Sequence, residues 1–332
     1  MADATDIMAA PAPTTEQPKK TAKTDEASQT HATPPTTATF SLVALPGGLV
    51  RNARPHQWVK NILVLAAPAA AGQLSDIDIL RQSAIVFLLF CAATSSIYLI
   101  NDALDVEADR AHPAKRHRPV AAGIVPLPAA YAAGILLALG SLVGTALLCS
   151  VGTATVLGIY LVVQVLYSAR LKHVLVVDLV IVASGFVLRS MFGGIAANIT
   201  LSQWFLITTG FGSLFMVGAK RYSELVLMGD QAAESRKLLA HYTTGYLRFV
   251  WQTSAGITVL AYCLWALGNQ GEGPDLWRQL SIVPFVFGVL RYALFADRGT
   301  AGAPEDVVLK DRVLLGTGLL WLIAYAVSVI GS

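Results

Sequence analysis

The sequence predicts an all-α integral membrane protein, and three observations support this fold class. Of the 332 residues, 55% are hydrophobic and 14% are charged, with a mean hydropathy of +0.58, whereas soluble domains carry about 25% charged residues. Apolar stretches of roughly 17 to 25 residues, long enough to cross a bilayer as helices, recur along the chain. Lys and Arg gather in alternate connections between those stretches.

Each apolar stretch is expected to form one transmembrane helix, and there are nine of them. Their approximate bounds are 57–73, 81–100, 127–149, 152–169, 174–196, 203–219, 247–268, 277–295 and 312–330. The first stretch is the weakest because Pro68 and Gly72 interrupt it. The connections CSVGT and AANITLSQ are short, whereas those at 101–126 and 220–246 are long and charged.

The N-terminal segment differs in composition from the rest of the chain. Residues 1–45 are rich in Ala, Thr, Pro, Gln and Lys, so we expect a disordered tail without a secretory signal, followed by a membrane domain at 46–332. Cys91, Cys149 and Cys263 lie inside or at the edge of apolar stretches and form no CxxC motif. They are interpreted as small buried hydrophobic residues, which leaves no disulfide or zinc site to predict.

The distribution of basic residues predicts an orientation. With the N-terminus in the cytoplasm, 21 of the 24 Lys and Arg residues lie inside, Arg81 and Arg278 lie outside, and Arg189 lies within a span. The positive-inside rule requires such an asymmetry. We therefore expect a multi-pass plasma-membrane protein with a cytoplasmic N-terminus and an external C-terminus. Its function should lie on the cytoplasmic face, where the long polar connections are.

An acidic motif follows the second apolar stretch. The segment NDALDVEADR (101–110) reads NDxxDxxxD, and if the helix continues, the three aspartates lie within about 60° of one another. Glu107 falls on the opposite face. Grouped carboxylates repel unless a cation lies among them, and all-oxygen ligands suit Mg²⁺. The candidate magnesium ligands are Asn101, Asp102, Asp105 and Asp109.

A dense group of cations lies close to these acids. Lys115, Arg116 and Arg118 follow within the same connection, and Lys220 and Arg221 fall on the same face of the membrane. Arg and Lys at this density are suited to phosphate groups, so the combination indicates a metal-bridged diphosphate. The alternative is a solvated helix end whose acids pair with neighbouring cations. His112 and His117 are interpreted as solvated loop residues, since magnesium disfavours imidazole.

One charge is expected inside the membrane. Arg189 lies near the middle of the stretch 174–196, where an unpaired charge is costly, so it should pair inside the bundle or line a polar cavity. Asp178, eleven residues earlier, lies on nearly the same face but ~16 Å away along a helix. Direct pairing of these two residues is therefore not expected.

The chain resembles the UbiA-type intramembrane prenyltransferase superfamily over roughly 51–330. The resemblance rests on NDALDVEADR after the second stretch, on YSARLK (167–172) after the fourth, and on nine spans that place both motifs on the cytoplasmic side. It implies a UbiA-like helical bundle that opens sideways to lipid, with a cytoplasmic-side active site. In that superfamily the first Asp-rich motif holds Mg²⁺ and a diphosphate.

The sequence also departs from the superfamily. Members that prenylate aromatic rings carry a second motif, DxxxD, after the sixth span, whereas this loop reads AKRYSELVLMGDQAAESRKLL, with Glu224 and Asp230 but no DxxxD. Together with RPHQWVKN, HPAKRHRP, VVDLVIVASGFVLR and GAKRYSEL, the pattern is most similar to a phosphoribosyltransferase branch that serves cell-wall arabinan synthesis. This resemblance implies 5-phosphoribosyl 1-diphosphate as donor and a polyprenyl (decaprenyl) monophosphate as acceptor.

The resemblance extends the set of candidate site residues. Phosphate binding, chiefly of the donor, is expected from Lys60, Lys115, Arg116, Arg118, Lys220 and Arg221. Further substrate-site candidates are Tyr167, Ser168, Lys172, Asp178, Arg189, Tyr222 and Glu224. The first four of these match the connection between the fourth and fifth spans, and Tyr222 and Glu224 are candidates to orient the ribose. Which cation binds which phosphate stays open.

Two other functions remain as alternatives. The first is ordinary prenyl transfer from a prenyl diphosphate to an aromatic acceptor, against which the missing DxxxD counts. The second is a transporter, although no internal repeat is visible and the charges collect on one face. In every case membrane phospholipids are expected partners and nucleic acid is not. Small-residue helix faces are compatible with a homo-oligomer.

Overall fold

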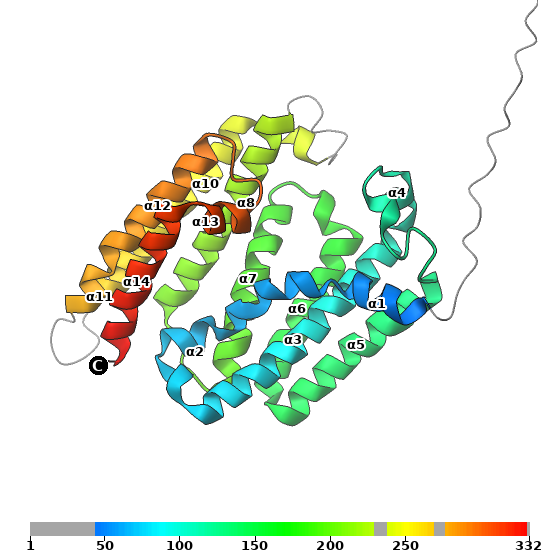
Figure 1. Cartoon of the computed structure of the whole chain (residues 1–332), viewed down its shortest axis with the longest axis horizontal. Coiled ribbons are helices and arrows are strands. Elements are labelled where there is room, and N and C mark those ends of the chain that lie inside the picture. The colour runs from blue at the N-terminus through cyan, green and yellow to red at the C-terminus, as the bar shows by residue number, and fades with distance from the viewer. Residues whose placement is uncertain (1–43, 229–237, 269–275, 331–332) are drawn as a thin grey trace, which may run out of the picture. The chain divides into compact units, whose positions relative to one another are not determined.

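The structure is a computed structural model that describes residues 44–228, 238–268 and 276–330 (Figure 1). These residues belong to one compact unit, Ala38–Ser332. The predicted tail at 1–45 lies outside the described residues except for its last two positions. Asp230 and the central part of the loop that lacks DxxxD also lie outside them.

All described secondary structure is helical, as the composition predicts. The long α-helices are α3 (Ile77–Leu104), α5 (Leu127–Leu148), α6 (Val151–Ala169), α7 (Val177–Ala196), α8 (Gln203–Met228), α10 (Thr244–Leu267), α12 (Ile282–Asp297) and α14 (Arg312–Ile330). The short α-helices are α1 (Leu45–Ala53), α2 (Ala66–Ala70), α4 (Val106–Ala111), α11 (Leu276–Leu280) and α13 (Pro304–Lys310). The 3-10 helices are η1 (Pro55–Leu65), η2 (Gln73–Ser75), η3 (Lys115–His117), η4 (Leu171–His173) and η6 (Leu239–His241).

Seven helical segments among the described residues are long and apolar enough to cross a membrane. They are 77–104, 127–148, 151–169, 177–196, 244–267, 276–297 and 312–329. Each corresponds to one of the nine predicted spans. The two predicted spans outside this set are 57–73 and 203–219. The second of these lies within α8, which has 26 residues but carries Thr208, Thr209 and Ser213 along its length.

The first predicted span is not a single α-helix, which corrects the expectation for 57–73. The chain there forms η1 followed by the short α2. Pro68 has no N–H to donate to the carbonyl of Val64, four residues earlier, so regular α-helical pairing cannot pass this point. The Val64 carbonyl lies against Gly193 of α7, where any Cβ would collide with it. Close contact between two backbones therefore requires glycine at position 193.

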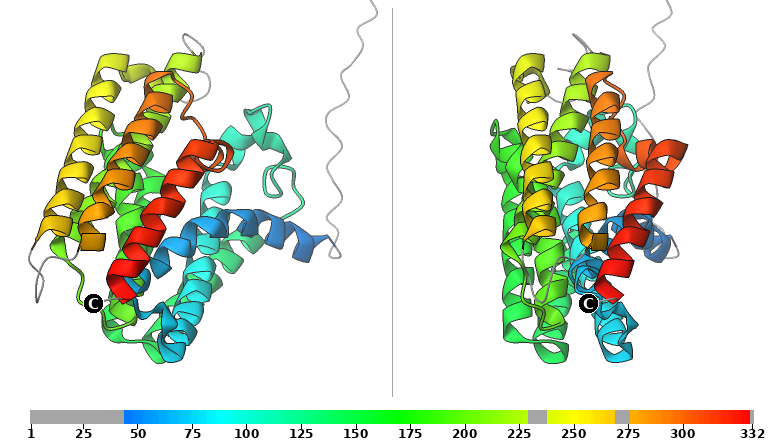
Figure 2. Two further views of the ribbon diagram at one scale, coloured as in Figure 1. Left: turned by 60° about the vertical axis from the view of Figure 1, so that its left-hand side comes forward. Right: turned by 90° about the vertical axis from the view of Figure 1, so that its left-hand side faces the viewer.

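The bundle is built on α3 and α7, which lie inside it. Helix α3 packs against α5, and α7 packs between α6 and α8, which in turn packs against α10 (Figure 1). In its most apolar window α3 is 56% buried, whereas α5 is only 17% buried. The outer helices expose leucines, including Leu136, Leu147 and Leu320, as a lipid-facing surface requires. In Figure 2, α14 lies beside α2, where Tyr325 donates to the carbonyl of Ala70.

Polar connections from several helices meet at one end of the bundle, which we call the charged end. It comprises 101–126, 170–178, 220–228, 238–243 and 298–311. Lys172 of η4 contacts Asp105 between α3 and α4, and Tyr242 after η6 contacts the backbone of Val176 before α7. The connection after α12 donates a backbone hydrogen bond to Ser223 of α8. Residues far apart in the sequence therefore form one polar region.

Candidate active site

The first acid of the NDxxDxxxD motif is buried and paired. Asp102 lies in the last turn of α3, and its side chain is 1% exposed. Arg54 donates from Nη2 to both of its carboxylate oxygens, at 2.6 and 2.9 Å, and its guanidinium lies 4.9 Å from the centre of the Tyr98 ring. Because a buried carboxylate without a partner is very costly, the contacts with Arg54 help to stabilise Asp102 inside the bundle.

Arg54 reaches Asp102 from an unusual backbone conformation. It joins α1 to η1 with φ 54° and ψ 61°, the left-handed region, which costs a non-glycine residue of order 1 kcal/mol or more. The following Pro55 excludes an ordinary helical conformation at position 54. Such strain persists only where surrounding contacts hold it, and the two contacts of Nη2 with Asp102 are among them.

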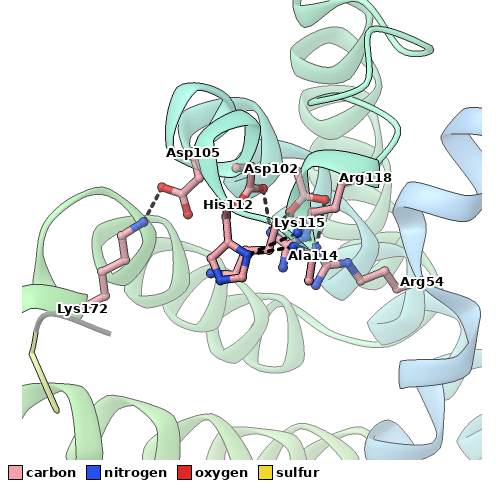
Figure 3. Close-up of polar contacts among 9 residues, drawn as sticks. Arg54, Asp102, Asp105, His112, Ala114, Lys115, Arg118 and Lys172 are labelled. Atoms are coloured by element: carbon pink, nitrogen blue, oxygen red, sulfur yellow. Dashed lines mark hydrogen bonds and ion pairs between the residues drawn. The ribbon is translucent and has the colours of Figure 1, made fainter. Parts of the chain in front are cut away.

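Arg118 joins the first and third acids. Its Nη1 lies 3.2 Å from Oδ1 of Asp102 and 2.7 Å from Oδ2 of Asp109 (Figure 3). Both acids are buried, with side chains 1% and 4% exposed. Since one nitrogen touches both carboxylates, these two acids face a single point that already holds positive charge.

The second acid faces a different cation. Asp105 lies at a break between α3 and α4 and contacts Nζ of Lys172 at 2.5 Å (Figure 3). The helix is therefore interrupted at this residue, although backbone bonds from Asp105 to Asn101 and from Asp109 to Asp105 keep the helical spacing on which the motif's geometry depends. Glu107 is 81% exposed and pairs with its neighbour in sequence, Arg110. The prediction that it lies on the opposite face is confirmed.

The acids fit a divalent cation in their chemistry, although they are now held by basic side chains. No group of three or more His, Cys, Asp or Glu side chains in the described part of the chain lies close enough to hold a metal ion. Mg²⁺ needs only one or two protein carboxylates, because water and substrate phosphate fill its other positions. Asp102 and Asp109 already converge on one positive group, and Asp105 and the half-buried Asn101 lie beside them.

The basic loop after α4 is only partly directed at these acids. Lys115 is half-buried, whereas Arg116 is exposed and its Nε contacts the ring of His117. The ring of His112 accepts backbone hydrogen bonds from Ala114 and Lys115 and so shapes the turn (Figure 3). Of the three cations predicted here, the structure brings only Arg118 into contact with the acids.

A second polar cluster surrounds Asp178 in the first turn of α7. The hydroxyl of Tyr242 donates to Oδ1 of the buried Asp178 at 2.6 Å and accepts from the backbone N–H of Val176. Burial, and then the bond to this acid, raise the pKa of Tyr242 well above its usual value. The Asp178 carboxylate also lies 3.8 Å from Nε of Arg221. The cluster is therefore held by one phenol and one guanidinium.

Two residues of α8 extend this cluster. Arg221 donates from Nη1 to Glu224 at 2.8 Å, and Nζ of Lys220 lies 4.0 Å from the same carboxylate. Tyr222 is buried, and its hydroxyl accepts from Arg248 of α10 at 2.6 Å. The structure thus brings Lys220, Arg221 and Glu224 together, while Tyr222 packs into the core between α8 and α10.

The remaining candidates lie at several places around the charged end. Ser168 is buried near the end of α6, and Tyr167 beside it is partly exposed. Lys60 of η1 lies 3.9 Å from Glu305 of α13. Arg189 lies inside the bundle and bonds to Asn61 of η1. Its pairing inside the bundle, and not with Asp178, agrees with expectation.

Two residues of the site were missed by sequence reasoning. Arg54 could have been found, since the proline after it indicates a turn beside the membrane and an arginine there needs a partner. Tyr242 carries no such signal: it lies 64 positions from Asp178, in a connection whose course the sequence does not indicate.

Apolar helices around a polar end with paired acids and cations define a multi-pass membrane protein with a charged cluster at one end of its bundle. The chain belongs to the UbiA prenyltransferase family, whose family model matches residues 61–311.

Relatives across most of the chain share one name. A protein of Mycolicibacterium smegmatis called decaprenyl-phosphate phosphoribosyltransferase is 48% identical over 291 residues, which is 84% of this chain and 91% of the relative. One of Corynebacterium glutamicum with the same name is 47% identical over 86% of this chain and 87% of its own. The predicted resemblance is confirmed by these relatives.

Solved structures of low sequence identity confirm the fold. A UbiA homolog from Archaeoglobus fulgidus bound to GPP and Mg²⁺ has a TM-score of 0.64 at 18% identity, and the match covers 86% of this chain and 100% of that one. A digeranylgeranylglyceryl phosphate synthase structure has a TM-score of 0.63, also at 18% identity, with 86% and 99% covered. The all-helical UbiA fold is therefore that of this chain.

Proposed function

We propose that this protein transfers the 5-phosphoribosyl group of 5-phosphoribosyl 1-diphosphate to a polyprenyl monophosphate, decaprenyl phosphate, with release of diphosphate. One observation carries the proposal: relatives named decaprenyl-phosphate phosphoribosyltransferase are 46–48% identical over 84–86% of this chain. The charged end supports it, because a donor with a diphosphate and a separate phosphate needs both acids for a metal and several cations.

The donor diphosphate is assigned to the acids at the end of α3. Asp102 and Asp109 converge on one point, and Asp105 and Asn101 flank them, so these four residues would hold Mg²⁺ with the diphosphate. A bound Mg²⁺ would stabilise the charge of the leaving diphosphate. Arg118, released from the two acids it now bridges, would turn to phosphate oxygens, as would Arg54, Lys115 and Arg116 around it.

We assign the cluster around Asp178 and Arg221 to the part of the donor that carries the 5-phosphate. In ring-prenylating members the DxxxD motif after the sixth span supplies acids at this place, whereas here Lys220 and Arg221 lie together with Glu224. Cations suit a phosphate, so we assign the 5-phosphate to Lys220 and Arg221. Glu224 and Asp178 hold Arg221 in position. The surroundings of the donor site are completed by four further residues, Lys172, Tyr167, Ser168 and Tyr222.

The reaction requires little acid–base chemistry from the chain. The bond between the anomeric carbon and the diphosphate breaks, and an oxygen of the lipid phosphate, already anionic near neutral pH, forms the new bond. No side chain needs to remove a proton. The side chains instead orient both anions and keep water from the anomeric carbon, where positive charge develops. Attack opposite the leaving group converts the α-donor into a β-product.

We also propose the membrane arrangement. The 57–73 segment and α8 would complete a set of nine spans, with the charged end and N-terminus in the cytoplasm, the C-terminus outside, and the protein in the plasma membrane. The distribution of Lys and Arg supports this orientation, since 21 of 24 then lie inside. The product would enter cell-wall arabinan synthesis, and loss of arabinose from the wall on depletion of the protein would test this role.

The decisive experiment is a transfer assay with the purified full chain. The protein in detergent is incubated with labelled 5-phosphoribosyl 1-diphosphate, polyprenyl phosphate and Mg²⁺, with and without a chelator. Label in the organic phase that disappears with chelator is the expected result. If no label transfers, but prenyl diphosphate and an aromatic acceptor react, the protein is an ordinary prenyltransferase and the proposal is wrong.

A further inference from the structure

Arg189 carries a positive charge inside the bundle, and its three hydrogen bonds occupy only some of its N–H groups. Nε donates to Oδ1 of Asn61 at 3.1 Å, Nη1 to the carbonyl of Gly185 at 2.7 Å, and Nη2 to the hydroxyl of Tyr160 at 3.3 Å. All three acceptors are neutral. A guanidinium has five N–H groups, so each terminal nitrogen keeps one N–H beyond these bonds.

The surroundings of Arg189 are aromatic. Its guanidinium carbon lies 5.3 to 5.4 Å from the ring centres of Phe90, Tyr160 and Phe186. Among the described residues, no Asp or Glu forms an ion pair with Arg189, and the acid on the same helix, Asp178, is held by Tyr242 and Arg221. Ring faces attract a cation but do not neutralise it. A charge at this depth therefore favours an anion.

Lys60 is a second cation on the same helix as the partner of Arg189. It directly precedes Asn61, the residue of η1 that accepts from Arg189. Its acidic partner, Glu305, lies 3.9 Å away, and both side chains are partly exposed, at 38% and 53%. Such an exposed pair is weak. Arg189 thus lies inside the bundle without an acidic partner, and Lys60 near it in the chain has only a weak one.

The geometry points to a phosphate monoester site formed by Arg189 and Lys60, and we propose that it binds the head group of the acceptor lipid. This inference rests on the proposed function. The fork of the Arg189 guanidinium suits two phosphate oxygens, and Lys60 suits a third as a point charge.

The position within the bundle favours the lipid over the donor. Asn61, which orients Arg189, also donates to Thr94 of α3 at 3.1 Å, and Thr94 lies eight residues before Asp102, or about 12 Å along the helix. Arg189 is therefore in the apolar part of the bundle, where an isoprenoid chain remains in lipid, while Lys60 lies on the side of the charged end, beside Glu305. We assign the water-soluble donor to the charged end instead. Its anomeric carbon would then lie between the two phosphate sites.

The test compares binding of a lipid with and without its phosphate. Equilibrium binding of labelled polyprenyl phosphate and of polyprenol of the same length is measured for the wild-type chain, R189Q, R189K and K60Q in detergent, without donor. R81Q, which removes an exposed cation at the start of α3, is the matched control. We expect the preference for the phosphate to fall about tenfold in R189Q and K60Q, with R81Q unchanged.

Kinetic constants separate the two possible sources of phosphate. The apparent KM for polyprenyl phosphate should rise about tenfold in K60Q, while the KM for the donor changes less than twofold. A selective rise in the donor KM would mean that the site holds the 5-phosphate, and unchanged binding in both K60Q and R189Q would mean that no phosphate site exists there. If the wild type transfers nothing, the proposed function fails, and the lipid-binding comparison still decides this inference.

Discussion

The Nη2 atom of Arg54 lies within 2.9 Å of both carboxylate oxygens of Asp102, although the two residues are 48 positions apart in the chain. Arg54 precedes residue 61, where the match to the family model begins. A residue outside the matched segment therefore completes the acidic site. The turn between α1 and η1 is tied by this pair to the end of α3.

Replacing Arg54 should damage both stability and donor binding. R54Q leaves the buried Asp102 carboxylate with Arg118 as its remaining cation, so we expect the free energy of unfolding to fall by about 2 to 3 kcal/mol. R54K restores the charge but on a shorter side chain that does not place its nitrogen where Nη2 lies, and should recover less than half of the loss. Thermal unfolding in detergent measures this, with R51Q, an exposed neighbour on α1, as control. Equal effects of R51Q and R54Q would show that the pair is unimportant.

The acids should differ sharply in their effect on transfer. We expect D102A and D105A to lower the rate about hundredfold or more while membrane insertion persists, because they remove metal and diphosphate contacts. E107A should be nearly silent, since Glu107 is exposed and faces away. Initial rates of purified variants at saturating substrate check this. A loss in E107A as deep as that in D105A would mean that the helical face is wrongly assigned.

Arg118 should compete with divalent cations for the two acids that it bridges. R118Q removes the positive charge between Asp102 and Asp109, so we expect it to bind Mn²⁺ about tenfold more tightly than the wild type in the absence of donor. The same variant should bind donor more weakly, because a phosphate contact is lost. Electron paramagnetic resonance of free and bound Mn²⁺ measures the first effect. Weaker Mn²⁺ binding in R118Q would contradict the competition.

Tyr242 should contribute stability that depends on pH. Y242F leaves Asp178 and the N–H of Val176 without the phenol, which should cost about 1 to 2 kcal/mol at neutral pH. The raised pKa means that the folded state favours the neutral phenol. Its stabilisation is therefore complete below about pH 10 and lost as the pH rises beyond that. Unfolding from pH 8 to 11 should show a steeper decline in the wild type than in Y242F, and parallel curves would exclude this role.

Position 193 should accept only glycine. A Cβ there collides with the carbonyl of Val64, so G193A must separate η1 from α7 and should cost about 3 kcal/mol. G140A, in α5 where a Cβ meets nothing within 4 Å, should be tolerated. The melting temperatures of the two variants in detergent provide the comparison, and similar values would show that the backbones can part easily.

The long helices and the inward face of the acidic motif could be predicted from sequence, because both depend on local periodicity. Asp102 and Asp109 lie inward and Glu107 outward, as spacing alone requires. The spacing could not predict which cation pairs with each acid. Lys172 is 67 positions from Asp105, and such a distance in sequence is closed only by the packing of α3 against α6 and α7.

The first span shows the limit of hydropathy more clearly. Its composition is apolar enough to cross a membrane, but hydropathy does not register the missing N–H of Pro68 or the approach of Val64 to Gly193. When contact with another helix determines the backbone conformation of a segment, the periodic pattern of hydrophobic residues in that segment does not reveal it.

The internal pairing of Asp102, Asp105 and Asp109 with Arg54, Arg118 and Lys172 has a consequence for biogenesis. A newly made chain must fold its helices before any ligand reaches the charged end, and unpaired carboxylates there would oppose the approach of α3, α6 and η1. Because the chain supplies its own counter-ions, folding does not wait for a metal, in contrast to small metal-dependent domains. The empty enzyme can therefore be assembled, inserted and stored in full before substrate appears.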